Sequence, residues 1–224
     1  MQTNQPPIEA AAPEWRLSGA PVPYPQAVAE MEARVAEIAA GRAGELVWLL
    51  EHPPLYTAGT SAKPGDLLDP DLLPVFPSGR GGQYTYHGPG QRIAYVMIEL
   101  RRHGLSMRGF AHALEDWAIR ALAAFGLKGE RRPGRVGIWV VDRNDPEREA
   151  KIAAIGVRVA RGVTYHGLSI NLDPDLGHYN GINPCGLPQD AKLGVTSLAA
   201  LGVNAAMRDL DAVLMETFEG VFPP

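Results

Sequence analysis

The chain has 224 residues, of which 46% are hydrophobic and 21% are charged, and a formal net charge of -4. This composition is ordinary for a soluble globular protein of one large or two small domains, and the negative charge disfavours a nucleic-acid-binding protein. The single cysteine, Cys185, excludes an internal disulfide and a cysteine-based zinc site, and it favours a reducing compartment, so we expect a cytoplasmic protein. Neither a Lys or Arg nor an apolar run precedes Arg16, so we expect no signal peptide or membrane span.

The N-terminal part begins with a polar, proline-containing stretch, residues 1–13, which predicts a disordered tail before a single domain over 14–224. A short strand is predicted at 15–17. A helix is predicted over 25–40, because apolar residues recur there at helical spacing and proline is favoured in a first helical turn. The apolar run 45–50 lies between chain-breaking residues and predicts a buried strand.

The middle of the chain is rich in turn-forming residues. Residues 52–59 predict a loop, and residues 60–79, punctuated by proline and aspartate, predict irregular structure. A strand is predicted over 93–100. An amphipathic helix is predicted over 107–125, closed by Gly126.

The C-terminal part predicts three strands, over 136–141, 151–159 and 163–171, with a hairpin turn at Arg161 and Gly162. Residues 142–149 predict a charged surface connection. Residues from Ser197 to about Phe218 predict a helix capped by Asn204. The order of these elements predicts an α+β fold, with a mainly antiparallel or mixed sheet and helices on its faces.

The stretch RGGQYTYHGPGQ, residues 80–91, is the most unusual in the sequence. The glycines after Arg80 let the backbone approach a ligand closely, and Gln83, Thr85 and His87 alternate, so they share one face of a strand. An arginine beside glycines can cradle a phosphate, but no known nucleotide-binding pattern is present, so that interpretation has weak support. A tight hairpin with polar side chains is the alternative.

Three histidines, His52, His87 and His166, lie in turn-flanked motifs. A single histidine is more often a structural residue than a functional one, and the spacing of these three matches no zinc signature. We therefore expect them to line a polar pocket, without a metal. The remaining histidines are interpreted as ordinary surface or helix residues: His103, His112 and His178.

Cys185 lies on a Pro-Cys-Gly turn that can present a thiol, and Lys151 opens a predicted strand that is otherwise apolar. A packed thiol and a solvated edge lysine are the simpler interpretations. The alternative is a nucleophile with a base, since a desolvated lysine has a lowered pKa and its charge lowers the pKa of a nearby thiol. The distance between the two side chains is left open by the sequence.

Two groups of arginines are each close together in the sequence. They are either solvated faces or a docking patch for an acidic protein partner. The groups are Arg101, Arg102 and Arg108, and Arg131, Arg132 and Arg135.

Several motifs together resemble the lipoyl(octanoyl) transferase family, also called lipoate-protein ligase B, across about residues 15–222. The resemblance implies the α+β fold of the biotin/lipoate protein ligase catalytic domain, with a central mixed sheet flanked by helices. It implies transfer of an octanoyl or lipoyl group from the thioester of acyl carrier protein to a lysine of a lipoyl domain, the first step of endogenous protein lipoylation. The motifs are HPP at 52–54, RGGQYTYHGPGQ at 80–91, KIAAIGV at 151–157, HGLSIN at 166–171 and PCG at 184–186.

The resemblance also implies roles for individual residues. Cys185 would form an acyl-thioester intermediate, and Lys151 would lower the pKa of its thiol and act as acid and base. No cofactor, ATP or metal would be needed, because the thioester donor is already activated. The implied acceptors are lipoyl domains of 2-oxoacid dehydrogenase complexes and the glycine cleavage H protein. The implied substrate-binding residues are Arg80, Gly81, Gly82, Gln83, Tyr84, Thr85, Tyr86, His87, Ala154, Ile155, Gly156, Gly167, Leu168 and Ser169.

Two other functions compete with this interpretation. An ATP-dependent lipoate or biotin ligase shares the fold and a lysine of this type, but it leaves the cysteine on its turn unexplained. A non-catalytic protein that binds an acyl chain or a carrier domain would have Cys185 merely packed. ATP dependence of the product and covalent acylation of Cys185 distinguish the three.

Overall fold

A computed structural model describes residues 12–141, 147–184 and 193–222. Most of the tail predicted at 1–13, part of the connection predicted at 142–149 and Cys185 itself lie outside the described residues.

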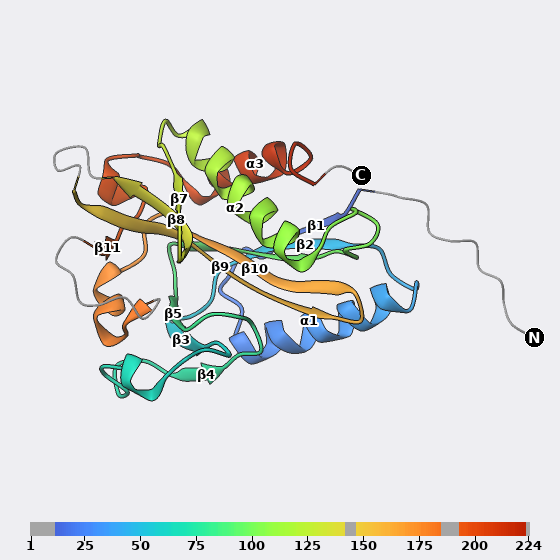
Figure 1. The fold of residues 1–224 in the computed structure, drawn as a ribbon, viewed down its shortest axis with the longest axis horizontal. Coiled ribbons are helices and arrows are strands. Elements are labelled where there is room, and N and C mark those ends of the chain that lie inside the picture. Colours follow the sequence, from blue (N-terminus) through green and yellow to red (C-terminus); the bar gives the residue numbers. More distant parts are fainter. Residues whose placement is uncertain (1–11, 142–146, 185–192, 223–224) are drawn as a thin grey trace, which may run out of the picture.

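A mixed sheet forms the centre of the molecule (Figure 1). Most neighbouring strands are antiparallel, whereas β1 pairs with β2 and β11 pairs with β9 in parallel. The α+β fold with a central mixed sheet is therefore confirmed. In spatial order the strands are β1 (Glu14–Leu17), β2 (Leu46–Leu50), β6 (Gln91–Met97), β10 (Val163–Asn171), β9 (Glu149–Ala160), β8 (Arg135–Val141) and β7 (Glu130–Arg132), with β11 (Leu193–Val195) beside β9.

A second, smaller sheet holds β4 (Val75–Pro77), β3 (Leu55–Ala58) and β5 (Tyr84–His87) in that order. The prediction of a loop over 52–59 was therefore wrong for its second half, and the stretch 60–79 contains a strand and a short 3-10 turn, Pro64–Asp66. Strand β3 forms because its apolar residues are buried against β5 and because both its edges find partners.

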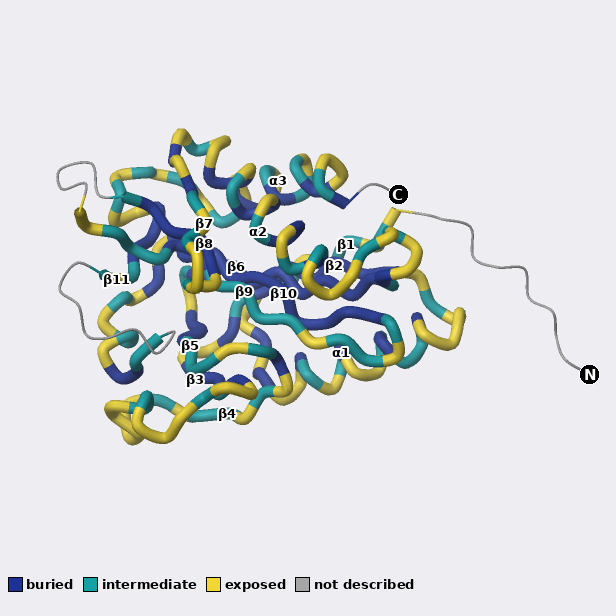
Figure 2. Tube along the Cα trace, viewed as in Figure 1, coloured by how far each residue is buried: buried dark blue, intermediate teal, exposed yellow. Residues whose placement is uncertain are grey.

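Within the described residues, three α-helices cover the main sheet. Helix α1 (Tyr24–Ala39) packs on one face, where its apolar stripe meets side chains of β2, β6 and β10. Helices α2 (Met107–Ala124) and α3 (Met207–Phe218) cover the other face and share the larger core (Figure 1). Burial is concentrated in the central strands and in the helix faces turned toward them (Figure 2). None of the described helices is long and apolar enough to cross a membrane.

The C-terminal helix begins later than the sequence predicts. Residues Ala199–Leu201 form a 3-10 turn that ends at Gly202, whose φ of 80° lies in the left-handed region. Helix α3 starts only at Met207, after Ala206, whose backbone N–H donates to the side chain of Asp209 at 2.8 Å. Asn204 is therefore not the N-cap of α3. It lies in the connection between Gly202, which ends the 3-10 turn, and Ala206, which precedes the helix.

Candidate active site

A cavity of about 750 Å³ lies between the small sheet and one end of the main sheet. It is bounded by the loop before β5, by β6, β9 and β10, by the start of α2 and by the turn between β7 and β8. This size is that of a typical small-molecule site. The residues expected at a site from the sequence that line this cavity are Arg80, Gly81, Gly82, Gln83, Tyr84, Thr85, His87, Lys151, Ala154, Ile155, Gly156, His166, Gly167, Leu168 and Ser169.

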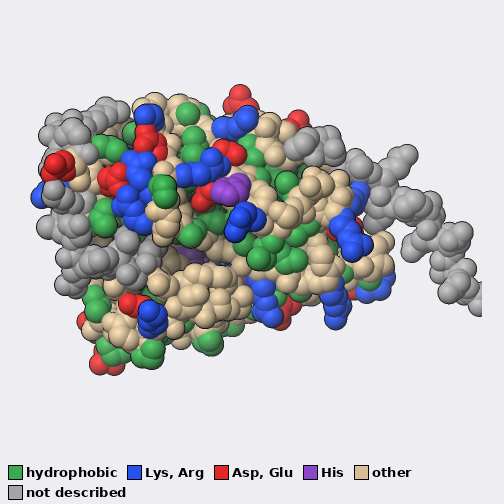
Figure 3. Space-filling model, in the orientation of Figure 1, with side chains coloured by type: hydrophobic (Ala, Val, Ile, Leu, Met, Phe, Trp, Pro, Cys, Tyr) green, Lys and Arg blue, Asp and Glu red, His purple; other side chains and the backbone are tan. Residues whose placement is uncertain are grey.

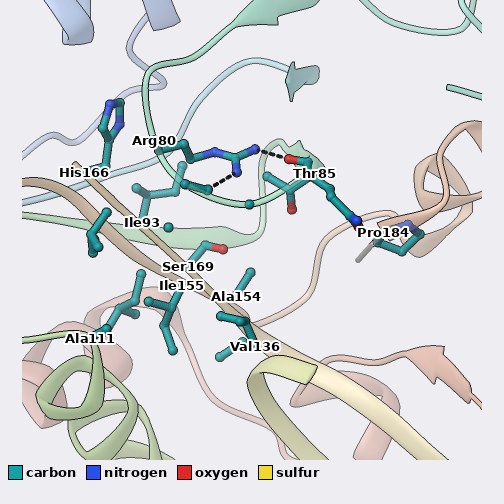
Figure 4. A pocket seen from close by; sticks show the side chains of 18 of the residues that line it. Arg80, Thr85, Ile93, Ala111, Val136, Ala154, Ile155, His166, Ser169 and Pro184 are labelled. Carbon is teal, nitrogen blue, oxygen red and sulfur yellow. Dashed lines mark hydrogen bonds between the residues drawn. The ribbon is translucent and has the colours of Figure 1, made fainter. Parts of the chain in front are cut away.

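The two sides of the cavity differ in chemistry. Ala111, Ile155 and Val136 lie together on one side, and Arg80 and Thr85 lie opposite them (Figure 4). The cavity therefore combines an apolar wall with a polar one. Such a site suits a ligand with a short hydrocarbon chain next to a polar reacting group.

Two expected residues, His52 and Tyr86, lie behind the wall and not in the cavity lining, which corrects the sequence-based expectation. His52 is fully buried, and its Nε2 is 2.7 Å from the hydroxyl of Tyr95. Tyr86 is 1% exposed and packs with Tyr56 and Ile182 in a separate core cluster. The loop 80–87 borders the cavity, whereas His52 reaches it only through Tyr95 and His87, which line it. The direction of each side chain is decided by packing that the sequence does not reveal.

Two histidines expected to be ordinary are also placed differently. The side chain of His103 is only 6% exposed, and its Nε2 lies 2.9 Å from a carboxylate oxygen of the buried Glu45. His178 packs against the ring of Tyr86, with its Nδ1 3.1 Å from the Tyr86 hydroxyl. Only His112 is exposed on a helix surface as expected.

Arg80 holds the loop that forms the polar wall. Its Nη2 donates to the backbone and side-chain oxygens of Thr57, at 2.9 and 2.7 Å, and to the backbone oxygen of Gln83 at 2.9 Å. Its Nη1 donates to Gly81 O at 3.0 Å. The hydrogen bonds within the loop are drawn in Figure 4. Because these bonds reach carbonyl oxygens of its own loop, Arg80 clamps the backbone and is not presented as a phosphate ligand.

Two glycines leave the space that Arg80 and its loop occupy. A Cβ on Gly59 would lie 2.3 Å from the backbone oxygen of Gly82, and one on Gly156 would lie 2.8 Å from Cδ of Arg80. The backbone of Gly81 also donates to Val157 O at 3.0 Å. The loop is therefore tied both to the small sheet and to strand β9, and side chains at the two glycine positions would force it open.

The buried histidines around the cavity are neutral. Burial lowers the pKa of His52 to about 4. Burial, helped by the charges of Arg80 and Arg158, lowers the pKa of His166 to about 3. His166 has a φ of 60°, which is unusual for a residue other than glycine and is typical of constrained functional sites. The polar wall therefore has neutral imidazoles near the clamped guanidinium.

A hydrogen-bonded network lies at the polar end of the cavity. His87 Nδ1 is 2.7 Å from Gln91 Oε1, and Gln91 Nε2 donates to Asn171 Oδ1 at 2.9 Å. Asn171 Nδ2 in turn donates to the backbone oxygen of Thr196 at 2.9 Å. Gln91 and Asn171 were not among the expected site residues. Gln91 begins β6 and Asn171 ends β10, and both are buried polar residues at a strand end. Both also lie in the motifs at 80–91 and 166–171, which is the signal that could have found them.

Lys151 lies on β9 and lines the cavity. It faces Trp139 of β8 and Val195 of β11 in register. A Cβ on Gly137 would be 2.4 Å from Cε of Lys151, so the lysine side chain passes directly over this glycine. A shift of register between β8 and β9 at Ile138 and Trp139 accompanies this arrangement.

The described chain reaches the cavity on both sides of the stretch 185–192, which contains the cysteine. Pro184 and Val195 both line it (Pro184 is labelled in Figure 4). The approach to Pro184 is held by the loop after β3, where Asn183 N donates to Asp66 O at 2.7 Å. Cys185 follows Pro184 directly in the sequence, and its own position lies outside the described residues.

The arginines differ in their surroundings. The group at 131–135 forms ion pairs, in which Arg131 meets Glu115 and Asp116, and Arg132 and Arg135 meet Glu149. Basic and acidic side chains accordingly lie side by side over β7 and β8 (Figure 3). The members of the other group, at 101, 102 and 108, are exposed, and Arg108 follows the cavity-lining Met107.

Comparison with known proteins gives one consistent result. A family model described as the lipoyl protein ligase A/B catalytic domain matches residues 23–219. An octanoyltransferase of Paramagnetospirillum magneticum is 62% identical over 93% of this chain and 96% of its own length, and one of Rhodospirillum rubrum is 58% identical over 94% and 95%. Among solved structures, a bi-partite lipoate protein ligase from Thermoplasma acidophilum superposes with a TM-score of 0.66 at 13% identity, covering 94% of this chain and 84% of that one.

Proposed function

Because the chain belongs to the lipoyl protein ligase A/B catalytic-domain family and its relatives are octanoyltransferases, it is an acyltransferase of protein lipoylation, and we propose that it acts through a cysteine thioester. In this proposal the donor is octanoyl-acyl carrier protein. The acceptor is a lysine of a lipoyl domain, carried by 2-oxoacid dehydrogenase complexes or the glycine cleavage H protein.

The first step is exchange of one thioester for another. The Cys185 thiolate attacks the acyl carbonyl, the bond to the carrier sulfur breaks, and the carrier leaves as a thiol after taking up a proton. Exchange between two thioesters is close to isoenergetic, so the site needs a reactive thiolate and correct positioning. The ammonium of Lys151 favours the thiolate by its charge and delivers the proton to the departing sulfur.

The second step forms the amide. The neutral amine of the acceptor lysine attacks the acyl-enzyme carbonyl, the bond to Cys185 breaks, and the amine loses one proton. Lys151, now neutral, accepts this proton and restores its charge beside the thiolate. Backbone N–H groups next to Cys185 or around Gly82 are candidates to stabilise the oxyanion.

The acyl chain lies along the apolar wall in this proposal. Residues 154–156 and 167–169 contact it there, because their strands bring Ile155 and Leu168 into the cavity. The loop 80–87, held by Arg80, lies against the reacting end. Each buried methylene contributes about 0.8 kcal/mol, so two carbons more or fewer change the affinity by only about 15-fold.

Protein partners approach at the rim of the cavity. Met107 and Val136 line the cavity and are each 59% exposed, so an incoming domain meets an apolar rim. The exposed arginines at 101, 102 and 108 lie near Met107 in the sequence, and in this proposal an acidic partner contacts them. A reducing compartment such as the cytoplasm keeps the thiol available.

One observation supports the proposal most strongly, namely that Lys151, Pro184 and Val195 line the same cavity. The residue before the only cysteine and the proposed base thus border the same space. We expect the enzyme to octanoylate a lipoyl domain from octanoyl-acyl carrier protein without ATP, and Cys185→Ser to abolish the reaction. Product formation that requires ATP would select a ligase, and acyl binding without transfer would select a non-catalytic carrier.

A further inference from the structure

The hydrogen positions of the polar network are fixed by a backbone carbonyl at one end. Gln91 Nε2 lies 3.2 Å from Tyr86 O, and because a carbonyl oxygen only accepts, the atom facing it is the amide nitrogen. Gln91 Oε1 therefore faces His87 Nδ1, at 2.7 Å. An amide oxygen also only accepts, so His87 Nδ1 carries a proton and donates it.

The other end of the network gives the same result independently. Asn171 Nδ2 donates to Thr196 O at 2.9 Å, so Asn171 Oδ1 is the atom that accepts from Gln91 Nε2. Water has little access to these side chains, because His87 is 7% exposed, Gln91 0% and Asn171 3%. They therefore hydrogen-bond mainly to one another and little to solvent. The backbone oxygens of Tyr86 and Thr196 therefore fix which atoms donate and which accept throughout the His87–Gln91–Asn171 network.

The second nitrogen of His87 is left as a neutral acceptor. Burial is the main cause that keeps the pKa of His87 well below its usual value, and the nearby His52 contributes less. The ring is therefore uncharged. With the proton on Nδ1, the lone pair is on Nε2. In the part of the chain that the structure describes, no group hydrogen-bonds Nε2, and His87 lines the cavity. The imidazole therefore offers the cavity an acceptor without a charge.

We propose that His87 Nε2 accepts a hydrogen bond from the amine of the incoming lysine, and that Gln91 and Asn171 are positioning residues that hold His87 in the tautomer that can do so. The inference rests on the proposed function, in which an amine attacks an acyl-enzyme. An acceptor at Nε2 binds an amine N–H and leaves the amine lone pair directed elsewhere, toward the acyl carbon. The opposite tautomer would place an N–H donor against that lone pair and oppose attack.

The network also joins the backbone that carries the proposed base. Thr196 accepts from Asn171 through its oxygen and donates through its N–H to Lys151 O at 3.0 Å. The amine acceptor, His87, and the base, Lys151, are therefore fixed to one continuous set of hydrogen bonds. Such a continuous set of hydrogen bonds restricts relative movement of the two residues, which is what a reaction that depends on positioning requires.

The test separates the two half-reactions in the full-length enzyme. Loading is followed by the mass of the enzyme after mixing with octanoyl-acyl carrier protein. Transfer is followed by mixing the pre-acylated enzyme with a lipoyl domain. In Gln91→Leu and His87→Phe, we expect transfer to slow by about 10- to 100-fold more than loading, the range expected for loss of one positioned hydrogen bond. The matched control is His112→Phe, the same change at an exposed histidine, which should slow neither step.

A spectroscopic measurement tests the tautomer directly. In ¹⁵N NMR of the unmodified enzyme, His87 should show a protonated Nδ1 and an unprotonated Nε2, and Gln91→Leu should shift the proton toward Nε2. A protonated Nε2 in the parent enzyme would overturn the inference whatever the kinetics, as would equal slowing of loading and transfer. Failure of the parent enzyme to acylate Cys185 would instead overturn the proposed function, and the NMR result would stand apart from it.

Discussion

Gly137 lies beneath the side chain of Lys151, so closely that a Cβ at position 137 would be 2.4 Å from Lys151 Cε. The φ of Gly137 is 108°, in the region that other residues avoid. A glycine on β8 therefore creates both the backbone bend and the space that direct the proposed base into the cavity. The irregular pairing of β8 with β9 is thus linked to the position of the proposed base, Lys151.

We predict that Gly137→Ala displaces Lys151 and lowers kcat about 100-fold, the usual cost of a 1 Å misplacement of a catalytic group. Backbone strain should also cost about 1–3 kcal/mol of stability, so kcat is measured well below the melting temperature. The matched control is Gly41→Ala, which introduces strain at a φ of 69° but meets no atom within 4 Å, and it should keep full activity. Equal activity of both variants would show that the position of Lys151 does not depend on Gly137.

Lys151→Ala should raise the pKa of the Cys185 thiol, because the proposal assigns thiolate stabilisation to the lysine charge. The measurement is the rate of iodoacetamide alkylation against pH, which follows the thiolate. The alkylation profile should move to higher pH in the variant. An unchanged profile would remove this role from Lys151, while leaving open its role in proton transfer.

Arg80→Lys should loosen the loop that forms the polar wall. A lysine cannot reach the oxygens of Thr57, Gly81 and Gln83 together, because an ammonium lacks the planar fork of guanidinium. We expect amide exchange over residues 79–83 to accelerate about 30-fold, corresponding to about 2 kcal/mol of lost local stability, and KM to rise. Arg42→Lys, at an exposed ion pair with Glu37, is the control. Unchanged exchange in Arg80→Lys would contradict the clamp.

The neutral histidines predict loss of stability in mild acid. Because the folded-state pKa values of His52 and His166 are about 4 and about 3, only the unfolded chain takes up protons as the pH falls below 6.5. Each histidine should therefore cost about 2 kcal/mol of unfolding free energy between pH 6.5 and pH 5. Urea unfolding at the two pH values measures this loss, and His52→Gln should reduce it. A flat profile would mean that these rings are charged or accessible in the folded protein.

Much of the fold could be predicted because its strands carry strong local signals. Strand β10 matches the predicted range 163–171, since it is a buried run bounded by a hairpin turn and a polar end. Strand β3 was missed, because its four residues follow two prolines and become a strand only by pairing with β4 and β5. The start of α3 was misplaced because Gly202 interrupts an otherwise helical pattern.

In the candidate site, too, features with a local sequence signal could be predicted, and features that depend on tertiary packing could not. The motif residues that line the cavity were found as motifs, but the inward or outward direction of His52 and Tyr86 depends on three-dimensional packing. The Gln91–Asn171 hydrogen bond joins residues 80 positions apart, which no local pattern reveals. Arg80 was expected to face a ligand, yet its guanidinium binds its own loop, because the carbonyl oxygens there need donors.

The central claim is that Cys185 carries the acyl group between donor and acceptor. The most direct measurement is peptide mass mapping after the enzyme is mixed with octanoyl-acyl carrier protein, without ATP and without a lipoyl domain. We predict one octanoyl group on the peptide that contains Cys185, lost when a lipoyl domain is added as the octanoyl group appears on its lysine. An unmodified Cys185 during rapid transfer, or an adduct on another residue that turns over at the same rate, would contradict the account.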